Sequence, residues 1–321
     1  MLARLMPRPR AIPATGDPTP TRTVAGYVWR MSGWHQVAIS TLALVVAALA
    51  MAPLELQRRL VNDGIGEGDL DLVLGLGGLW IGVVLVAGAA KYGLRLYQEW
   101  LSESAIRYCR RHLLTVHRER LEEGRHAEDG RAVAILGREI DQLGGFVGEG
   151  LSQVVVNAGM LAAIAGYMLV VDPRIAAVGL ALIIPQAIGA PLAQRRLNRF
   201  VARRVRLLRR LSDDVAAMTP EHREPPERLW PELDDIYTNR LRIAVLKHLI
   251  KGTVNVVNNL APAAVFVAGG WLVVEGATSV GVVVAFASGV QRMAEPIREL
   301  ANFVRVIARA GVQHEMIAKW M

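Results

Sequence analysis

The sequence predicts an all-α membrane protein with six transmembrane helices and long helical extensions on one side of the membrane. The 321-residue chain is 52% hydrophobic and 21% charged, which is too apolar for an ordinary soluble domain. Its apolar segments are each about 20 residues long, enough to cross a hydrocarbon core of about 30 Å. Arginine-rich stretches of helical character follow two of these segments directly.

The chain is expected to have three parts. Residues 1–21 are rich in Pro, Arg and Thr without apolar periodicity, which is typical of disorder. Residues 22–33 are predicted to form a short helix at the membrane interface. Residues 34–321 would then form the six-helix domain. The apolar face of the interfacial helix consists of Val24, Tyr27, Val28 and Met31.

The first two spans differ in the segments that come after them. The first is expected over residues 34–54 and to end at an acidic outer loop, residues 55–71. The second is expected over residues 72–90. Residues 91–123 contain no proline and no glycine after Gly93, so this helix should continue for about 40 Å or more beyond the lipid, at about 1.5 Å per residue.

Four more spans complete the predicted bundle. They are expected over residues 151–171, 175–193 and 254–274 and from Ser279 onward. The fourth continues into an arginine-rich extension, and the fifth is entered by a helix from near Glu232. The sixth is marginal by hydropathy, because polar residues interrupt it after about a dozen apolar positions. Such polar groups must face protein or a wet cavity.

The basic residues predict the orientation. Of 37 Lys and Arg residues, only Arg58, Arg59 and Arg174 lie in the three predicted outer loops. Both termini are therefore expected in the cytoplasm of a multi-pass protein in a bacterial-type inner membrane. The net charge of +8 favours the anionic headgroups of the lipid bilayer as a partner and makes nucleic acid a poor one.

Polar residues within the spans are candidates to line a cavity. Asn255, Asn258 and Asn259 form one stripe on the fifth span, and Gln153 and Asn157 are four residues apart on the third. Interhelical hydrogen bonding is the alternative role for these amides. On the sixth span, Arg292 and Glu295 either contact substrate or join an intrahelical ion-pair ladder with Arg298 and Glu299. Two glycine pairs predict close helix packing: Gly78 with Gly82, and Gly144 with Gly148.

These features together resemble the transmembrane domain of ATP-binding-cassette exporters of the type IV fold, also called the type-1 exporter fold. The resemblance covers residues 23–318 and depends on the order and spacing of motifs that are individually weak. One is the stretch from Leu60 to Asp69 after Pro53, similar to the first outer loop of the family. Others are Gly269–Gly270 through Gly276, then Thr278, Gly281, Ala285, Phe286 and Pro296, similar to the family's turn between the fifth and sixth helices. Gly130, followed by Leu136, Glu139, Ile140, Asp141 and Leu143, resembles the pattern after the first coupling helix.

The resemblance implies two segments that dock into an ATPase. The residues in these positions are Glu128, Asp129, Gly130 and Arg131 in the first segment and Glu221, His222 and Arg223 in the second. The sequence also departs from the family pattern. The second segment is rich in proline and a few residues short, and Glu139 stands where the family usually has Asp.

The chain contains no GxxxxGK[ST] loop to hold the phosphates of a nucleotide. It is therefore not expected to be an enzyme or to bind a cofactor. The resemblance implies a permease subunit of an exporter, paired with another such domain as a homodimer or heterodimer. ATP and Mg²⁺ would bind a separately encoded ATPase subunit. Two alternatives remain open: a proton-coupled secondary transporter on the same scaffold, and a degenerate subunit that regulates a complete exporter. The sequence does not identify the substrate.

Metal binding and thiol chemistry are not predicted. His112, His117 and His126 lack the spacing of zinc ligands. The one cysteine, Cys109, lies in a stretch expected in the cytoplasm and is predicted to stay reduced.

Overall fold

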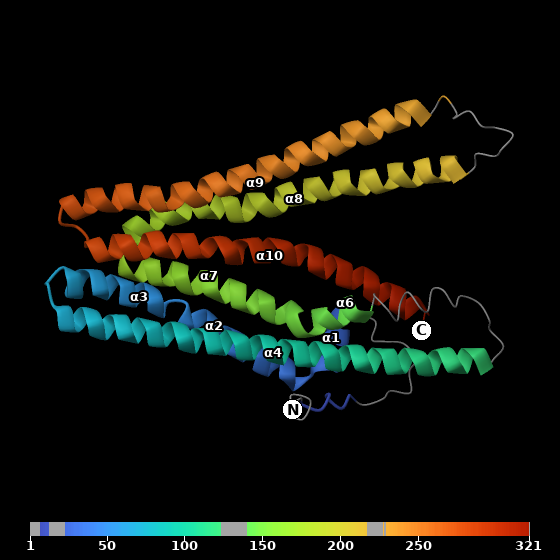
Figure 1. Cartoon of the computed structure of the whole chain (residues 1–321), viewed down its shortest axis with the longest axis horizontal. Coiled ribbons are helices and arrows are strands. Elements are labelled where there is room, and N and C mark those ends of the chain that lie inside the picture. Colours follow the sequence, from blue (N-terminus) through green and yellow to red (C-terminus); the bar gives the residue numbers. More distant parts are fainter. Residues whose placement is uncertain (1–6, 13–22, 123–139, 217–226, 228, 321) are drawn as a thin grey trace.

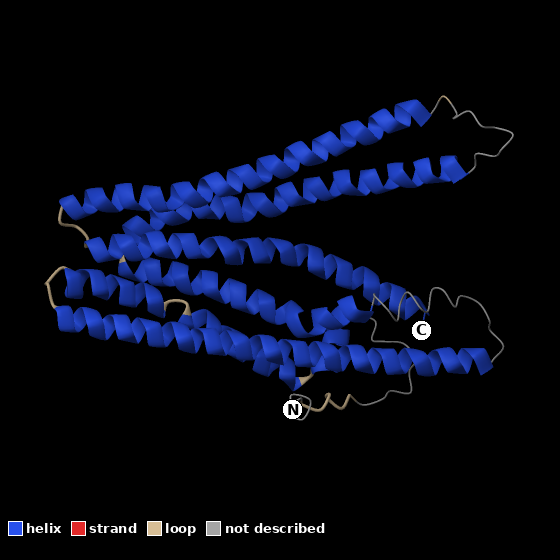
Figure 2. Cartoon of the chain, in the orientation of Figure 1, coloured by secondary structure: helices blue, strands red, loops and turns tan. Residues whose placement is uncertain are grey.

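A computed structural model describes residues 7–12, 23–122, 140–216, 227 and 229–320. Within these ranges every regular element is a helix and no strand is present (Figures 1 and 2). Among the described residues, five helices are long and apolar enough to cross a membrane, as expected of a multi-pass, all-α membrane protein. They are Trp34–Ile65, Leu70–Glu119, Ile140–Val171, Pro173–Ala216 and Leu229–Val274.

The amino-terminal helices follow one another closely in the chain, with one sharp turn at Gly33. Helix α1 (Val24–Ser32) begins at Thr23, whose hydroxyl accepts a hydrogen bond from the Gly26 amide at 3.1 Å. Gly33 then takes a positive φ of 52°, a conformation that glycine adopts without steric cost, so the chain turns into α2. The next helices in this region are α2 (Trp34–Leu49), α3 (Ala52–Arg59) and the π-helix η2 (Leu60–Ile65).

The prediction of a loop over residues 55–71 is wrong. The chain stays helical through Ile65, and only residues 66–69 form the turn to the next helix. The charged residues remain in the helix because they neutralise one another. Glu55 accepts hydrogen bonds from Arg58 at 2.6 and 2.8 Å, from Arg59 at 2.7 Å and from the Tyr167 hydroxyl at 3.0 Å.

Three helices are far longer than a membrane crossing requires. Helices α4 (Leu70–Glu122), α8 (Pro173–Ala216) and α9 (Leu229–Val274) have 53, 44 and 46 residues. At about 1.5 Å per residue they are about 80, 66 and 69 Å long. The structure therefore confirms that the helices of the second, fourth and fifth predicted spans continue well beyond their apolar segments.

Helix α10 (Val280–Trp320) corresponds to the marginal sixth span. It has 41 residues, which is long enough to cross, but it is not among the five helices that satisfy both the length and the hydropathy criteria. It packs against α7, α8 and α9, and Val282, Phe286 and Val290 are buried in a core shared with them. The position of α10 is therefore fixed by its contacts with other helices.

The segment before the third span packs tightly against α4. It consists of α6 (Ile140–Gly145) and the π-helix η4 (Phe146–Gly150), and it leads directly into α7 (Leu151–Val171), the third span. Gly144 faces Ile106 and Gly148 faces the backbone of Gln98, in both cases without room for a side chain. The prediction of close packing is confirmed here. It is wrong for Gly78 and Gly82, which have no other atom within 4 Å of where a Cβ would lie.

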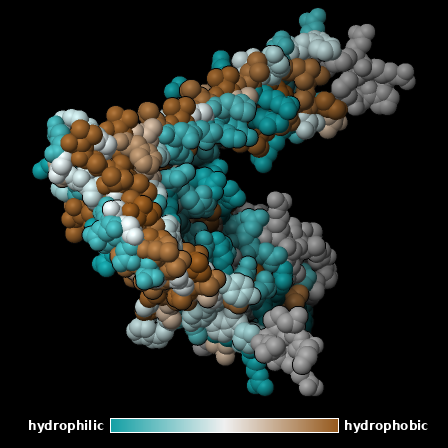
Figure 3. All heavy atoms as spheres, turned by 60° about the vertical axis from the view of Figure 1, so that its left-hand side comes forward, coloured by the Kyte–Doolittle hydropathy of each residue, from teal (hydrophilic) through white to brown (hydrophobic). Residues whose placement is uncertain are grey.

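Three short turns between long helices lie at one end of the molecule, on the left in Figure 1, which we call the short-turn end: residues 66–69, Asp172 and residues 275–279. Toward the opposite end, α8 and α9 stay side by side but diverge from the other helices (Figure 1). The Asn239 amide donates to the Phe200 carbonyl at 3.0 Å and holds the pair together. Figure 3 shows the wide, largely hydrophilic gap between this pair and the rest of the chain.

Residues 7–12, predicted to be disordered, instead lie against α1 and α4. The Arg10 amide donates to the Ser104 hydroxyl at 3.1 Å, and the Trp100 indole donates to the Arg8 carbonyl at 3.0 Å. The Arg10 side chain also donates to the Met31 carbonyl. Burial lowers the pKa of Arg10 from its ordinary value. Local composition missed these contacts because they depend on residues 21, 92 and 94 positions away.

Cys109 lies on α4 and is buried where α4 contacts α1. Its Sγ lies 2.6 Å from the Tyr27 hydroxyl, and burial raises the pKa of that hydroxyl well above its ordinary value. Because the thiol is shielded from solvent, this contact is structural.

Candidate functional site

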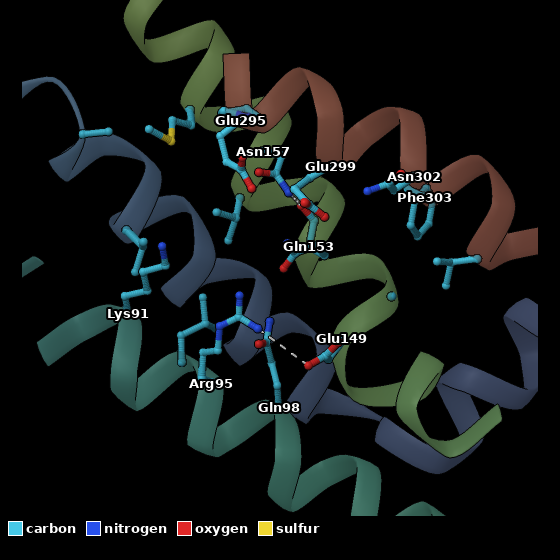
Figure 4. Close-up of a pocket in the computed structure, with 18 of the residues that line it drawn as sticks. Lys91, Arg95, Gln98, Glu149, Gln153, Asn157, Glu295, Glu299, Asn302 and Phe303 are labelled. Atoms are coloured by element: carbon cyan, nitrogen blue, oxygen red, sulfur yellow. Dashed lines mark hydrogen bonds and ion pairs between the residues drawn. The ribbon is translucent and has the colours of Figure 1, made fainter. Parts of the chain in front are cut away.

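A cavity of about 790 Å³ lies between α2, α4, α7 and α10. Figure 4 shows α4 on one side and α10 on the other, with α7 between them. This volume is within the range of small-molecule sites in proteins, about 300–1,000 Å³. The cavity combines apolar and charged linings, so it suits an amphipathic molecule.

The α4 wall carries two cations and an amide on one helix face. Lys91, Arg95 and Gln98 are spaced at i, i+4 and i+7, and all three line the cavity (Figure 4). Gln98 is buried and donates to the Ser152 hydroxyl at 2.7 Å, which fixes α4 against α7.

The π-helix η4 presents an acidic side chain to this wall. Glu149 lies in η4 and lines the cavity, and its Oε1 lies 3.9 Å from Nη1 of Arg95 (Figure 4). About half of each side chain is exposed, 55% for Arg95 and 48% for Glu149, so the pair contributes about 1 kcal/mol or less to stability. π-Helical turns occur often at functional sites.

The α10 wall contains part of the predicted ladder. Arg298 contacts Glu295 at 2.6 Å and Glu299 at 3.7 Å, and both glutamates line the cavity. Arg292 also lines the cavity. It has no hydrogen bond or ion pair with the residues that the structure describes, so it does not belong to the ladder.

Two of the predicted amides form the α7 side of the cavity. Gln153 and Asn157 both line it (Figure 4), and the Asn157 amide donates to the Gln153 backbone carbonyl at 2.7 Å. Since this bond uses one donor of Asn157, the other polar atoms of the two side chains can contact a ligand.

The asparagine stripe on α9 lies elsewhere. Asn255, Asn258 and Asn259 are not among the residues that line this cavity, so their role in a translocation path stays a prediction. Asn258 accepts a hydrogen bond from the Gln186 side chain on α8 at 3.1 Å, and the Asn259 amide donates to the Asn255 carbonyl at 2.8 Å. The structure thus favours the alternative role, interhelical hydrogen bonding, for Asn258.

The two predicted coupling segments lie outside the described residues. They contain Glu128, Asp129, Gly130 and Arg131, and Glu221, His222 and Arg223. Their role stays a prediction. Among the described residues, no group of three or more His, Cys, Asp or Glu side chains is arranged to hold a metal ion.

The sequence did not identify several residues of the cavity. The clearest missed signal is the i, i+4, i+7 spacing of Lys91, Arg95 and Gln98, which puts three polar groups on one face where the apolar part of α4 ends. The others gave no signal of their own, because only tertiary packing brings them to the same space. The missed lining residues with polar side chains are Lys91, Arg95, Gln98, Gln142, Glu149, Glu299, Asn302, Arg309 and Gln313.

In comparisons with known proteins, no protein-family model matches the chain, and no curated protein is significantly similar to it. The residues and the fold are therefore the basis for any functional assignment.

Proposed function

We propose that this chain is the transmembrane permease subunit of an ATP-driven exporter of the ATP-binding-cassette type, driven by a separately encoded ATPase. The observation that carries the proposal is the length of α4, α8 and α9. Each exceeds the thickness of a bilayer core, about 30 Å, by roughly 36–50 Å at about 1.5 Å per residue. Continuous helices of this length transmit a displacement at one end to the other end, as a motor-driven transporter requires.

The divergence of α8 and α9 supports assembly with a second subunit. Both helices expose apolar residues along the extension, including Val205 (44% exposed), Leu241 (47%) and Val245 (66%). A helix pair of this kind is typically stabilised by a partner that covers such residues. Another domain of the same fold, in a homodimer or a heterodimer, would be such a partner.

The cavity supports transport better than catalysis. Its lining combines charged and amide groups with apolar residues, among them Val46, Leu49, Pro53, Val84 and Met160. Such a lining binds an amphipathic substrate without reacting with it.

Proton-coupled transport is less well supported. That mechanism needs a desolvated carboxylate that titrates near the middle of the membrane. Glu295 is 61% exposed and paired with Arg298, and Glu149 is 48% exposed and near Arg95. Both carboxylates therefore have a counter-cation and access to solvent.

Inside-out membrane vesicles from the native cell test the energy source even while the substrate is unidentified. Vesicles with and without the chain are incubated with cell extract, and accumulated compounds are compared by mass spectrometry. We expect at least one compound to accumulate only when both the chain and ATP are present. Vanadate should abolish this accumulation, and a protonophore should leave it unchanged.

Two outcomes would contradict the proposal. Chain-dependent accumulation that collapses with the protonophore but persists without ATP would indicate a secondary transporter. Identical accumulation with and without the chain would exclude a permease role in those membranes.

A further inference from the structure

The charges that line the cavity are not balanced. Its three carboxylates have cationic neighbours: Glu149 lies near Arg95, and Glu295 and Glu299 both contact Arg298. Three of its cations, Lys91, Arg292 and Arg309, have no such neighbour. None of the three forms a hydrogen bond or ion pair with any residue in the described part of the chain. With Arg298 included, five cations stand against three carboxylates, so a net charge of +2 remains at the cavity.

Arg292 is the most informative of these cations because of its depth. Since α10 begins at Val280 at the short-turn end, Arg292 lies about 18 Å along the helix at about 1.5 Å per residue. That distance is slightly more than half of a bilayer core of about 30 Å. Arginine is costly at this depth and is usually retained for a function.

Apolar residues line this level of the cavity together with Asn157 and Glu295. Met160 on α7 and Val84 on α4 lie at similar distances from the short-turn end and line the same cavity. Lys91 lies about 31 Å along α4 from Leu70 by the same rise per residue, close to the opposite membrane surface. The two cations thus lie at different depths, with an apolar lining beside the deeper one.

We propose that the cavity binds an anionic amphiphile whose phosphate or carboxylate group pairs with Arg292, with Lys91 as a second contact nearer the surface. A guanidinium group binds such anions through two parallel hydrogen bonds. The apolar residues beside Arg292 would bury the hydrocarbon part. This inference rests on the proposed function, because it assigns the cavity to the transported molecule.

Binding is tested with the purified full-length chain in detergent, without ATP or an ATPase. Native mass spectrometry measures the affinity for dilauroyl phosphatidic acid, an anionic lipid, and for dilauroyl phosphatidylcholine, a zwitterionic lipid with the same chains. We expect the phosphatidic acid to bind about tenfold more tightly. Arg292→Gln should weaken phosphatidic acid binding about tenfold and phosphatidylcholine binding much less, because the choline cation offsets the phosphate charge. Lys91→Gln should weaken phosphatidic acid binding less than Arg292→Gln does.

Three controls keep the interpretation specific. Arg292→Lys retains the charge and should retain most of the affinity. Lys251→Gln removes an exposed cation of α9 that does not line the cavity, and should leave both affinities unchanged. Thermal unfolding of each variant verifies that it is folded.

The proposal is overturned if Arg292→Gln leaves phosphatidic acid binding unchanged or weakens both lipids equally. It is also overturned if inorganic phosphate competes as well as the lipid does, because the apolar lining would then contribute nothing. Since the assay contains no ATP, a negative result leaves the vesicle experiment unaffected, and failure of ATP-driven transport leaves the binding result unaffected.

Discussion

Replacing Gly148 by leucine is expected to prevent stable folding of the chain. A side chain at this position would overlap the Gln98 carbonyl and the Ser102 hydroxyl of α4, and the Gln98 carbonyl belongs to backbone that cannot move without distorting the helix. Overpacking costs typically 1–3 kcal/mol, and we expect a loss of at least about 3 kcal/mol here. Fluorescence-detected size-exclusion chromatography and the thermal unfolding midpoint measure the effect.

Gly78→Leu is the matched control. Gly78 lies on α4 in a glycine pair of the same spacing, but nothing lies within 4 Å of its added Cβ. We expect this variant to fold normally, with a small gain from the higher helix propensity of leucine, up to about 1 kcal/mol. If both variants fold equally well, the close contact between η4 and α4 is incorrect.

A proline at Glu103 is expected to break the rigid extension of α4 and to abolish transport. Proline in a helix interior removes a hydrogen bond and clashes with the preceding turn, at a cost of about 3 kcal/mol or more. Glu103 is exposed, but Leu101 and Ala105 beside it are buried, so a kink would also disturb the core. Chain-dependent, ATP-driven accumulation in vesicles should fall at least tenfold, whereas Glu103→Ala should keep it.

Spin labels measure the rigidity directly. Cysteines replace Tyr92 and Leu114, which are 68% and 53% exposed, in a chain whose native cysteine is changed by Cys109→Ser. A continuous helix predicts one narrow distance distribution centred at about 33 Å, at about 1.5 Å per residue. Glu103→Pro should broaden it. A broad distribution in the parent chain would show that the extension is not rigid.

Hydropathy predicted the long helices well because the signal is local. A run of about 20 apolar residues has few alternatives to a membrane-spanning helix, and the absence of proline after Lys91 predicted the extension of α4. The same reasoning failed at Glu55. Its charge resembles the start of a loop, but hydrogen bonds from Arg58, Arg59 and Tyr167 keep it within a helix.

The cavity was harder to predict because it depends on which helix faces meet. Asn258 and Asn157 are both amides within apolar helices, yet Asn258 pairs with Gln186 and Asn157 lines the cavity. The two glycine pairs also have the same spacing but different surroundings, since only Gly144 and Gly148 lie against another helix. Periodicity tells which residues share a face, but it does not tell what that face contacts.

The proposed function requires a separate ATPase that drives this chain. The most direct measurement is purification of the chain from native membranes, followed by identification of associated proteins and by assay of ATP hydrolysis. We expect a protein with a GxxxxGK[ST] loop to co-purify in a fixed ratio and to hydrolyse ATP in a vanadate-sensitive manner.

The coupling residues provide the decisive comparison. Replacing Glu221, His222 and Arg223 by glycine, together with Glu128, Asp129 and Arg131, should remove that ATPase and its activity while the chain remains folded in the membrane. The account is contradicted if the chain purifies folded and without an ATPase, or if the ATPase stays bound after both segments are replaced.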